Sequence, residues 1–139
     1  MEIAYLDTSA LVKRYHKEEY SDVIDEIFEK YVISISELTI VELTSALRKK
    51  VDEKEIRQKE MFRVLTKFYE DLTDFIVLKF DSEVISNAVD LIIRYRLKTL
   101  DSLQLAFAIK LKDYDPLFVS FDRKLINSAK SEGFKVLEI

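Results

Sequence analysis

The sequence contains no cysteine and only one glycine and one histidine, and each of these scarcities excludes a class of site. Without cysteine there is no disulfide framework and no thiolate metal site, which fits a reducing cytoplasm. Gly133 is the only glycine, so the glycine-rich loops of P-loop and dinucleotide-binding proteins are impossible. His16 is the only histidine, which excludes a zinc site with several histidine ligands and leaves His16 as the sole base for a Ser-His-Asp triad. We expect His16 to be a solvated surface residue.

The composition is that of a globular protein with one sizeable core. Of 139 residues, 48% are hydrophobic and 35% are charged. No stretch approaches the ~20 apolar residues of a membrane span, and the N-terminus lacks a secretory pattern, so we expect no membrane partner. The net charge of −4 provides no overall positive field, so a surface for nucleic acid would have to be local or metal-mediated.

Short apolar runs rich in β-branched residues alternate with segments of helical periodicity. Buried strands are predicted at residues 2–6, 31–36, 75–80 and 117–121, with a last edge strand at 135–139. Strands that alternate with helices require right-handed crossovers and a parallel sheet covered on both faces. We therefore expect one domain over residues 1–139, an α/β fold of three α/β/α layers around a central parallel sheet.

The longest predicted helix is highly charged and runs from about Asp52 to Leu72. Its apolar residues predict a buried stripe made of Phe62, Leu65, Phe68, Tyr69 and Leu72. The segment "RKKVDEKEIRQK", which overlaps its start, is most simply an exposed helical hairpin.

Four acidic residues lie where predicted strands give way to helices. Asp7 directly follows the first strand, and Asp122 directly follows the fourth. Glu42 lies about two turns beyond the second strand, and Asp101 opens a helix after "RLKTL". Ligands of such sheets bind beyond the carboxyl ends of the strands. We therefore expect the four carboxylates to converge at one edge.

Each of these acids also has a simpler explanation as a helix cap. Asp7 and Asp122 are suitable N-caps, and the spacings T-x-x-E at 39–42 and D-x-x-Q at 101–104 fit capping boxes. Capping explains why one acid stands at one helix start. It does not explain why several elements direct acids toward the same edge of the sheet.

Convergence of the acids would predict a metal site. Two carboxylates ~4 Å apart repel by roughly 4 kcal/mol at an effective dielectric constant near 20, so protons or a cation must intervene. Carboxylates without histidine or cysteine favour Mg²⁺ or Mn²⁺. The chemistry that suits such a site is phosphodiester hydrolysis, in which the metal lowers the pKa of a bound water and neutralises the leaving oxygen. Ser9, two residues after Asp7, is the best candidate among nearby hydroxyls for holding a phosphate or the water.

Four segments together resemble a known family: "LDTSALVKRY", "ELTIVELTSAL", "LKTLDSLQLAFA" and "FVSFDRKLINSAKSEGFKVL". Their order and spacing are similar to those of PIN domains, most closely the VapC-type ribonuclease toxins of prokaryotic toxin–antitoxin pairs, over essentially the whole chain. The resemblance implies a metal-dependent ribonuclease. Its acidic catalytic and metal-binding residues fall on Asp7, Glu42, Asp101 and Asp122, and its hydroxyl on Ser9 or Thr8.

The resemblance also implies partners. Such proteins form homodimers, and a cognate antitoxin that packs on apolar helices holds them inactive. The family's common glycine before the third acid is absent, since Arg96 and Leu97 stand there. We expect this to alter a turn and not the site.

Basic residues flank the acidic segments and are candidates for an RNA path, although solvated helix faces explain them equally well. They are Lys13, Arg14, Arg94, Arg96, Lys98, Arg123 and Lys124.

Alternative functions fit the pattern less well. A PIN-type nuclease of RNA processing would lack an antitoxin. A phosphoacceptor signalling domain needs paired acids after the first strand, where only Asp7 stands, and a haloacid-dehalogenase-like phosphatase needs an acid at position 9, which is Ser9. An interaction module with a degenerate site does not account for an intact set of four acids.

Overall fold

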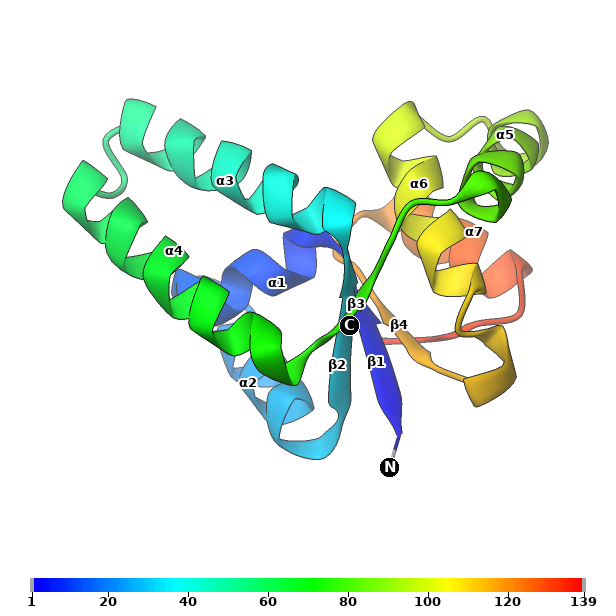
Figure 1. The fold of residues 1–139 in the computed structure, drawn as a ribbon, viewed down its shortest axis with the longest axis horizontal. Helices are drawn as coiled ribbons and strands as arrows, with labels where there is room; N and C mark the ends of the chain where they lie inside the picture. The colour runs from blue at the N-terminus through cyan, green and yellow to red at the C-terminus, as the bar shows by residue number, and fades with distance from the viewer. Residues whose placement is uncertain (1, 139) are drawn as a thin grey trace.

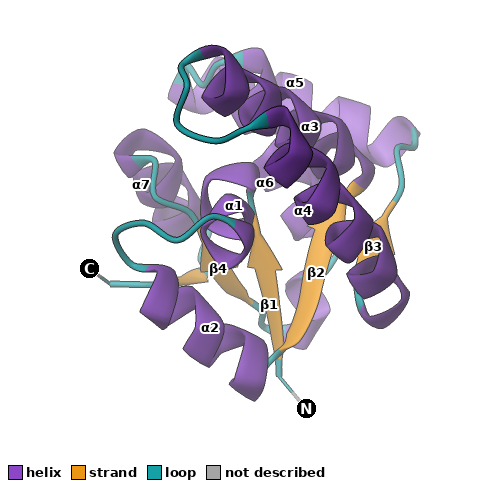
Figure 2. Cartoon of the chain, turned by 90° about the vertical axis from the view of Figure 1, so that its left-hand side faces the viewer, coloured by secondary structure: helices purple, strands orange, loops and turns teal. Residues whose placement is uncertain are grey.

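A computed structural model describes residues 2–138, in which five strands form one parallel sheet with helices on both faces (Figures 1 and 2). The strand order is β3-β2-β1-β4-β5, and every neighbouring pair is parallel. The strands are β1 (Ile3–Leu6), β2 (Val32–Ser36), β3 (Ile76–Leu78), β4 (Leu117–Val119) and β5 (Lys135–Val136). The predicted α/β/α fold is confirmed. Ile139, the predicted end of the last strand, lies outside the described residues.

The helices divide into two sets, one for each face of the sheet (Figure 1). The first four are α1 (Thr8–Tyr15), α2 (Ser21–Lys30), α3 (Glu37–Asp52) and α4 (Gln58–Asp71). The second set is α5 (Ser82–Tyr95), α6 (Thr99–Ile109) and α7 (Arg123–Ser131). Over residues 2–138, no helix is both long and apolar enough to cross a bilayer.

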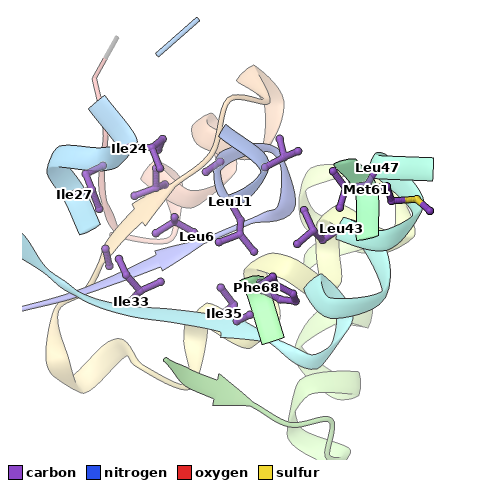
Figure 3. Packing of buried hydrophobic residues seen from close by; sticks show 14 of the residues in the cluster. Leu6, Leu11, Ile24, Ile27, Ile33, Ile35, Leu43, Leu47, Met61 and Phe68 are labelled. Carbon is purple, nitrogen blue, oxygen red and sulfur yellow. The ribbon is translucent and has the colours of Figure 1, made fainter. Parts of the chain in front are cut away.

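Alternating residues of β1 contribute to two separate cores. Ala4 and Leu6 pack with the first set of helices, whereas Tyr5 packs with the second. The Tyr5 ring stacks on Phe118 of β4, with 5.8 Å between ring centroids. Figure 3 shows the first core, where Leu6 lies among side chains from β2 and the helices. Each face of the sheet therefore has its own apolar layer, as expected for a parallel sheet covered on both sides.

The strand order reverses beside β1. The chain first adds β2 and β3 on one side of β1 and then adds β4 and β5 on the other. Ligands of open parallel sheets bind at such a switch point, beyond the carboxyl ends of the strands. Because β1 ends at Leu6 and β4 ends at Val119, Asp7 and Ser120 emerge side by side there.

The long charged helix is shorter than predicted. Helix α4 begins at Gln58, and residues 53–57 form the turn of a hairpin with α3. The predicted stripe is also wrong in part, because Phe62 is 56% exposed and Tyr69 is 54% exposed. The helix packs on α3 along a narrow line, so only Met61 and Phe68, one heptad apart, are buried in it.

This packing makes two similar substitutions in α4 unequal. Phe68→Ala should reduce the free energy of unfolding by about 3–5 kcal/mol, because it empties a fully buried site. Phe62→Ala should change it by less than about 0.5 kcal/mol, since most of that ring is already in water. Urea denaturation of both variants measures the difference, and equal losses would show that α4 lies differently on the core.

Candidate active site

Asp7 is a buried carboxylate at the switch point. It is 5% exposed, and its backbone N–H donates to the Val119 carbonyl at 3.1 Å. Its Oδ1 accepts from the Ala10 N–H at 3.0 Å, which makes Asp7 the N-cap of α1. Oδ1 also accepts from the Ser9 hydroxyl at 2.7 Å, and Oδ2 accepts from the Ser120 hydroxyl at 2.6 Å. The capping prediction is confirmed, but capping uses only one of these three bonds.

The two serine hydroxyls also bind the segment that follows β4. Ser9 Oγ accepts from the Phe121 N–H at 3.0 Å, and Ser120 Oγ accepts from the Asp122 N–H at 3.1 Å. Asp122 itself is exposed and caps α7, accepting from the Leu125 N–H at 2.9 Å. These bonds bring Asp7 and Asp122 to the same end of the sheet, although they are far apart in the chain.

Glu42 reaches the site from the second turn of α3. The predicted capping box is wrong, because Ser36 is the N-cap and α3 begins before Thr39. The Glu42 side chain is therefore available for other contacts. Its Oε1 accepts from the Thr8 hydroxyl at 2.9 Å and from the Gln104 amide at 2.6 Å. These bonds join α3 to α1 and to α6.

Asp101 is the third residue of α6 and is half-buried. The capping box predicted here is also wrong, since Lys98 is the N-cap and the Gln104 side chain is buried elsewhere. The pKa of the Asp101 carboxyl is raised, first by burial and then by the charges of Asp122 and Glu42. The cations of Lys98 and Lys124 oppose that rise.

The four acids share one electrostatic field. Burial raises the pKa of Asp7 from 3.8 to about 6, and the charge of Asp101 adds to that rise. Hydrogen bonds from Ser120, Ser9 and the Ala10 N–H lower the pKa but do not cancel the effect of burial. Each carboxylate therefore lies close enough to another of the four to influence its ionisation or to be influenced by it.

The donor set fits a hard divalent cation in an open site. Across residues 2–138, no three His, Cys, Asp or Glu side chains form a ready-made metal cage. Mg²⁺ does not need one, because it retains several waters and usually takes one or two carboxylates together with substrate phosphates. The available donors are all oxygens, from Asp7, Glu42, Asp101 and Asp122, with hydroxyls beside them.

The basic residues separate into two groups. Three of the seven form ion pairs: Lys13 with Glu18, Arg14 with Asp25, and Arg94 with Asp90 and Glu132. The other four, Arg96, Lys98, Arg123 and Lys124, are exposed and form no ion pair with any residue in the range 2–138. They lie on the α5–α6 connection and the start of α7, and we call them the basic rim. Lys124 Nζ donates to the Arg96 carbonyl at 2.7 Å, so the two segments are in contact.

Comparison with known proteins identifies the family. The sequence matches the PIN domain family over residues 4–136. This chain belongs to that family. A search of the curated proteins found no match.

Several solved structures that resemble this PIN domain come from toxin–antitoxin systems. A toxin–antitoxin complex from Klebsiella pneumoniae aligns with a TM-score of 0.69 and 16% identity, over 97% of this chain and 96% of the other. VapBC2 from Rickettsia felis, bound to a promoter DNA fragment, aligns with a TM-score of 0.67 and 17% identity, over 97% of both chains. VapC20 from Mycobacterium tuberculosis, a toxin that cleaves the sarcin–ricin loop, aligns with a TM-score of 0.67 and 13% identity, over 96% of both chains. At these identities the likeness shows a shared fold.

The turn before Asp101 contains a residue in the conformation that glycine favours. Arg96 ends α5 with φ 57° and ψ 35°, in the left-handed region. A non-glycine residue is uncommon there and costs of order 1–2 kcal/mol. The family's common glycine is thus replaced at this turn by residues that include the basic Arg96, which adopts the left-handed conformation.

Sequence reasoning missed the role of Gln104. It assigned Gln104 to a capping box, whereas the side chain is 3% exposed and contacts Glu42. The pattern "SLQLAFA" held the relevant sign, since a polar residue stands within the most apolar helical segment. His16 lies at the C-cap of α1 and is half-buried, not fully solvated as predicted.

The raised pKa of Asp7 predicts how stability depends on pH without metal. The folded state holds the Asp7 proton more tightly than the unfolded chain, so this stabilisation is present below pH 3.8 and is lost as pH rises to about 6. In EDTA at pH 7, Asp7→Asn should therefore increase the free energy of unfolding by on the order of 2–3 kcal/mol. The gain should vanish near pH 4.

Urea denaturation at both pH values measures this, with Asp113→Asn, at an exposed acid, as the matched control. If Asp7→Asn is no more stable than the parent chain at pH 7, the carboxylate is not disfavoured by its surroundings.

Proposed function

We propose that this PIN domain is a Mg²⁺- or Mn²⁺-dependent endoribonuclease that hydrolyses RNA phosphodiester bonds, as the toxin of a VapBC-type toxin–antitoxin pair. The observation that carries the proposal is the shared field of Asp7, Glu42, Asp101 and Asp122 at the switch point of the sheet. The likeness to VapC20, a toxin that cleaves RNA, supports the choice of substrate. The absence of cysteine fits action in the cytoplasm.

The residues of the site have separate roles in the proposed reaction. The four acids are the residues that would hold the cation, and a bound cation would supply a Lewis acid for the phosphate and for the attacking water. Ser9 donates to Asp7 and accepts from the loop after β4, so it fixes the direction in which the buried carboxylate points. The basic rim attracts the RNA backbone from the side of α6 and α7.

An antitoxin is the proposed protein partner. The K. pneumoniae structure is a toxin–antitoxin complex, and the R. felis structure contains VapBC2 bound to DNA. On this chain, Phe62 and Tyr69 leave apolar rings exposed on α4. An apolar segment of a partner could bury these rings, which would explain why apolar side chains stand outside the core.

A second copy of the chain is the proposed partner of α5. Its exposed residues include an apolar stripe at the spacing i, i+4, i+7 and i+8: Ile85, Val89, Ile92 and Ile93. Ile93 is 75% exposed, which is unusual for isoleucine in an isolated domain. An exposed apolar helix face of this kind suits the two-fold interface of a homodimer.

Cleavage of RNA should require both the metal and Asp101. With Mg²⁺ or Mn²⁺ the purified protein should cut single-stranded RNA, and EDTA should abolish cleavage. Asp101→Asn should lower the rate by more than about 100-fold. Loss of a group that only supports a metal ligand lowers activity by up to about 100-fold, and Asp101 is proposed as a ligand itself. Asp101 caps no helix, so circular dichroism should show an intact fold. Gel assays measure cleavage, and Asp113→Asn is the matched control on an exposed acid.

Full cleavage in EDTA would contradict the proposed function, and so would full activity of Asp101→Asn.

The apolar stripe predicts the oligomeric state. Ile93→Asp should convert a dimer into a monomer, because a buried unpaired charge at an interface is strongly unfavourable. Tyr114→Asp, at a residue that is 69% exposed outside α5, should leave the dimer intact. Light scattering coupled to size exclusion gives the mass directly. A parent chain that is monomeric at high concentration would remove this part of the proposal.

A further inference from the structure

A buried polar network lies beneath the acidic site, with Gln104 at its centre. The Gln104 side chain is 3% exposed on α6, in the most apolar part of the chain. Its Nε2 donates to Glu42 Oε1 at 2.6 Å and to Thr39 Oγ1 at 3.0 Å. Its Oε1 accepts from the Tyr5 hydroxyl at 2.6 Å. One amide therefore connects β1, α3 and α6.

The carboxylate of Glu42 fixes the polarity of this network. An ionised carboxylate can only accept hydrogen bonds, so the amide must turn its Nε2 toward Glu42. The Oε1 then faces Tyr5, and the Tyr5 hydroxyl must donate. The second hydrogen of Nε2 is donated to Thr39, so both the nitrogen and the oxygen of the buried amide have hydrogen-bond partners. Only this orientation of the amide satisfies all of these groups. The flipped amide would place the Gln104 oxygen against the Glu42 carboxylate, so that two acceptors would face each other.

Tyr5 supports that orientation. It is fully buried on β1, and its ring is held by Phe118. Burial, with the charges of Asp7 and Glu42, raises the pKa of the Tyr5 hydroxyl above its ordinary value. Tyr5 therefore remains a protonated donor at neutral pH.

We propose that Gln104, oriented by Tyr5, is a positioning residue that holds the Glu42 carboxylate in place for the cation. This rests on the nuclease function proposed above and adds residues that touch neither substrate nor metal. Glu42 comes from a long helix of the first core, whereas Asp101 comes from α6 on the other face of the sheet. Gln104 lies on the same helix as Asp101, so its bond to Glu42 sets the position of one acid relative to the other.

The test separates this role from that of an ordinary buried polar residue. Gln104→Met keeps the length of the side chain and removes the amide, and Tyr5→Phe removes only the hydroxyl oxygen. Ser34→Ala is the matched control, because Ser34 is also fully buried and its hydroxyl bonds to the Ile76 carbonyl, away from the acids. All three variants are expected to lose some thermal stability.

Only the first two variants should weaken metal binding. Titration calorimetry with Mn²⁺ should show a dissociation constant raised by about 10- to 100-fold for Gln104→Met, the range for partners of metal ligands. Tyr5→Phe should show a smaller rise, and Ser34→Ala none. With RNA, kcat should fall while KM is unchanged. Mn²⁺ affinity of Gln104→Met equal to that of the parent chain would overturn the proposal. A Tyr5→Phe variant indistinguishable from Ser34→Ala would overturn the part assigned to Tyr5.

A crystal structure of metal-free Gln104→Met tests the proposal even where the nuclease function fails. If the parent chain neither binds Mn²⁺ nor cleaves RNA, the proposed function is wrong, and the position of Glu42 still decides the role of Gln104. A changed Glu42 rotamer in the variant supports positioning. An unchanged rotamer, with Thr8 alone holding the carboxylate, overturns it.

Discussion

The site depends on a carboxylate buried between two parallel strands. Asp7 leaves β1 where β4 ends beside it, and two serine hydroxyls take one oxygen each. Those bonds offset part of the penalty of burying a carboxylate that is 5% exposed, although burial still raises its pKa. The same serines bind the backbone after β4 and set the start of α7. One buried charge thus organises the end of the sheet.

The remaining acids extend this arrangement at a cost to stability. Burial and neighbouring negative charges raise the pKa of Asp7 and of Asp101, so ionisation of these two carboxyls destabilises the metal-free folded state. The two apolar cores supply the stability that the site gives up. A function that binds a cation explains why the chain maintains this repulsion, since a cation removes it.

The sequence predicted the fold because apolar residues follow different spacings in its strands and in its helices. It also predicted where Asp7 and Asp122 lie, since both follow strands directly. It was wrong about the capping boxes at Glu42 and Asp101, because a local spacing does not say at which residue a helix begins. It was wrong about Phe62 because helical spacing does not show how wide a face of α4 the core covers, and that face includes Met61 and Phe68 but not Phe62. The contacts of Gln104 join three distant segments, and only coordinates show them.

The acids come in equal numbers from the two halves of the molecule. Asp7 and Glu42 stand on helices of one core, and Asp101 and Asp122 stand on helices of the other, with the sheet between them. The site is therefore a seam, aligned only while both halves keep their register on the shared strands. A shift of one half against the other would therefore change the spacing between the two pairs of acids without exposing either core.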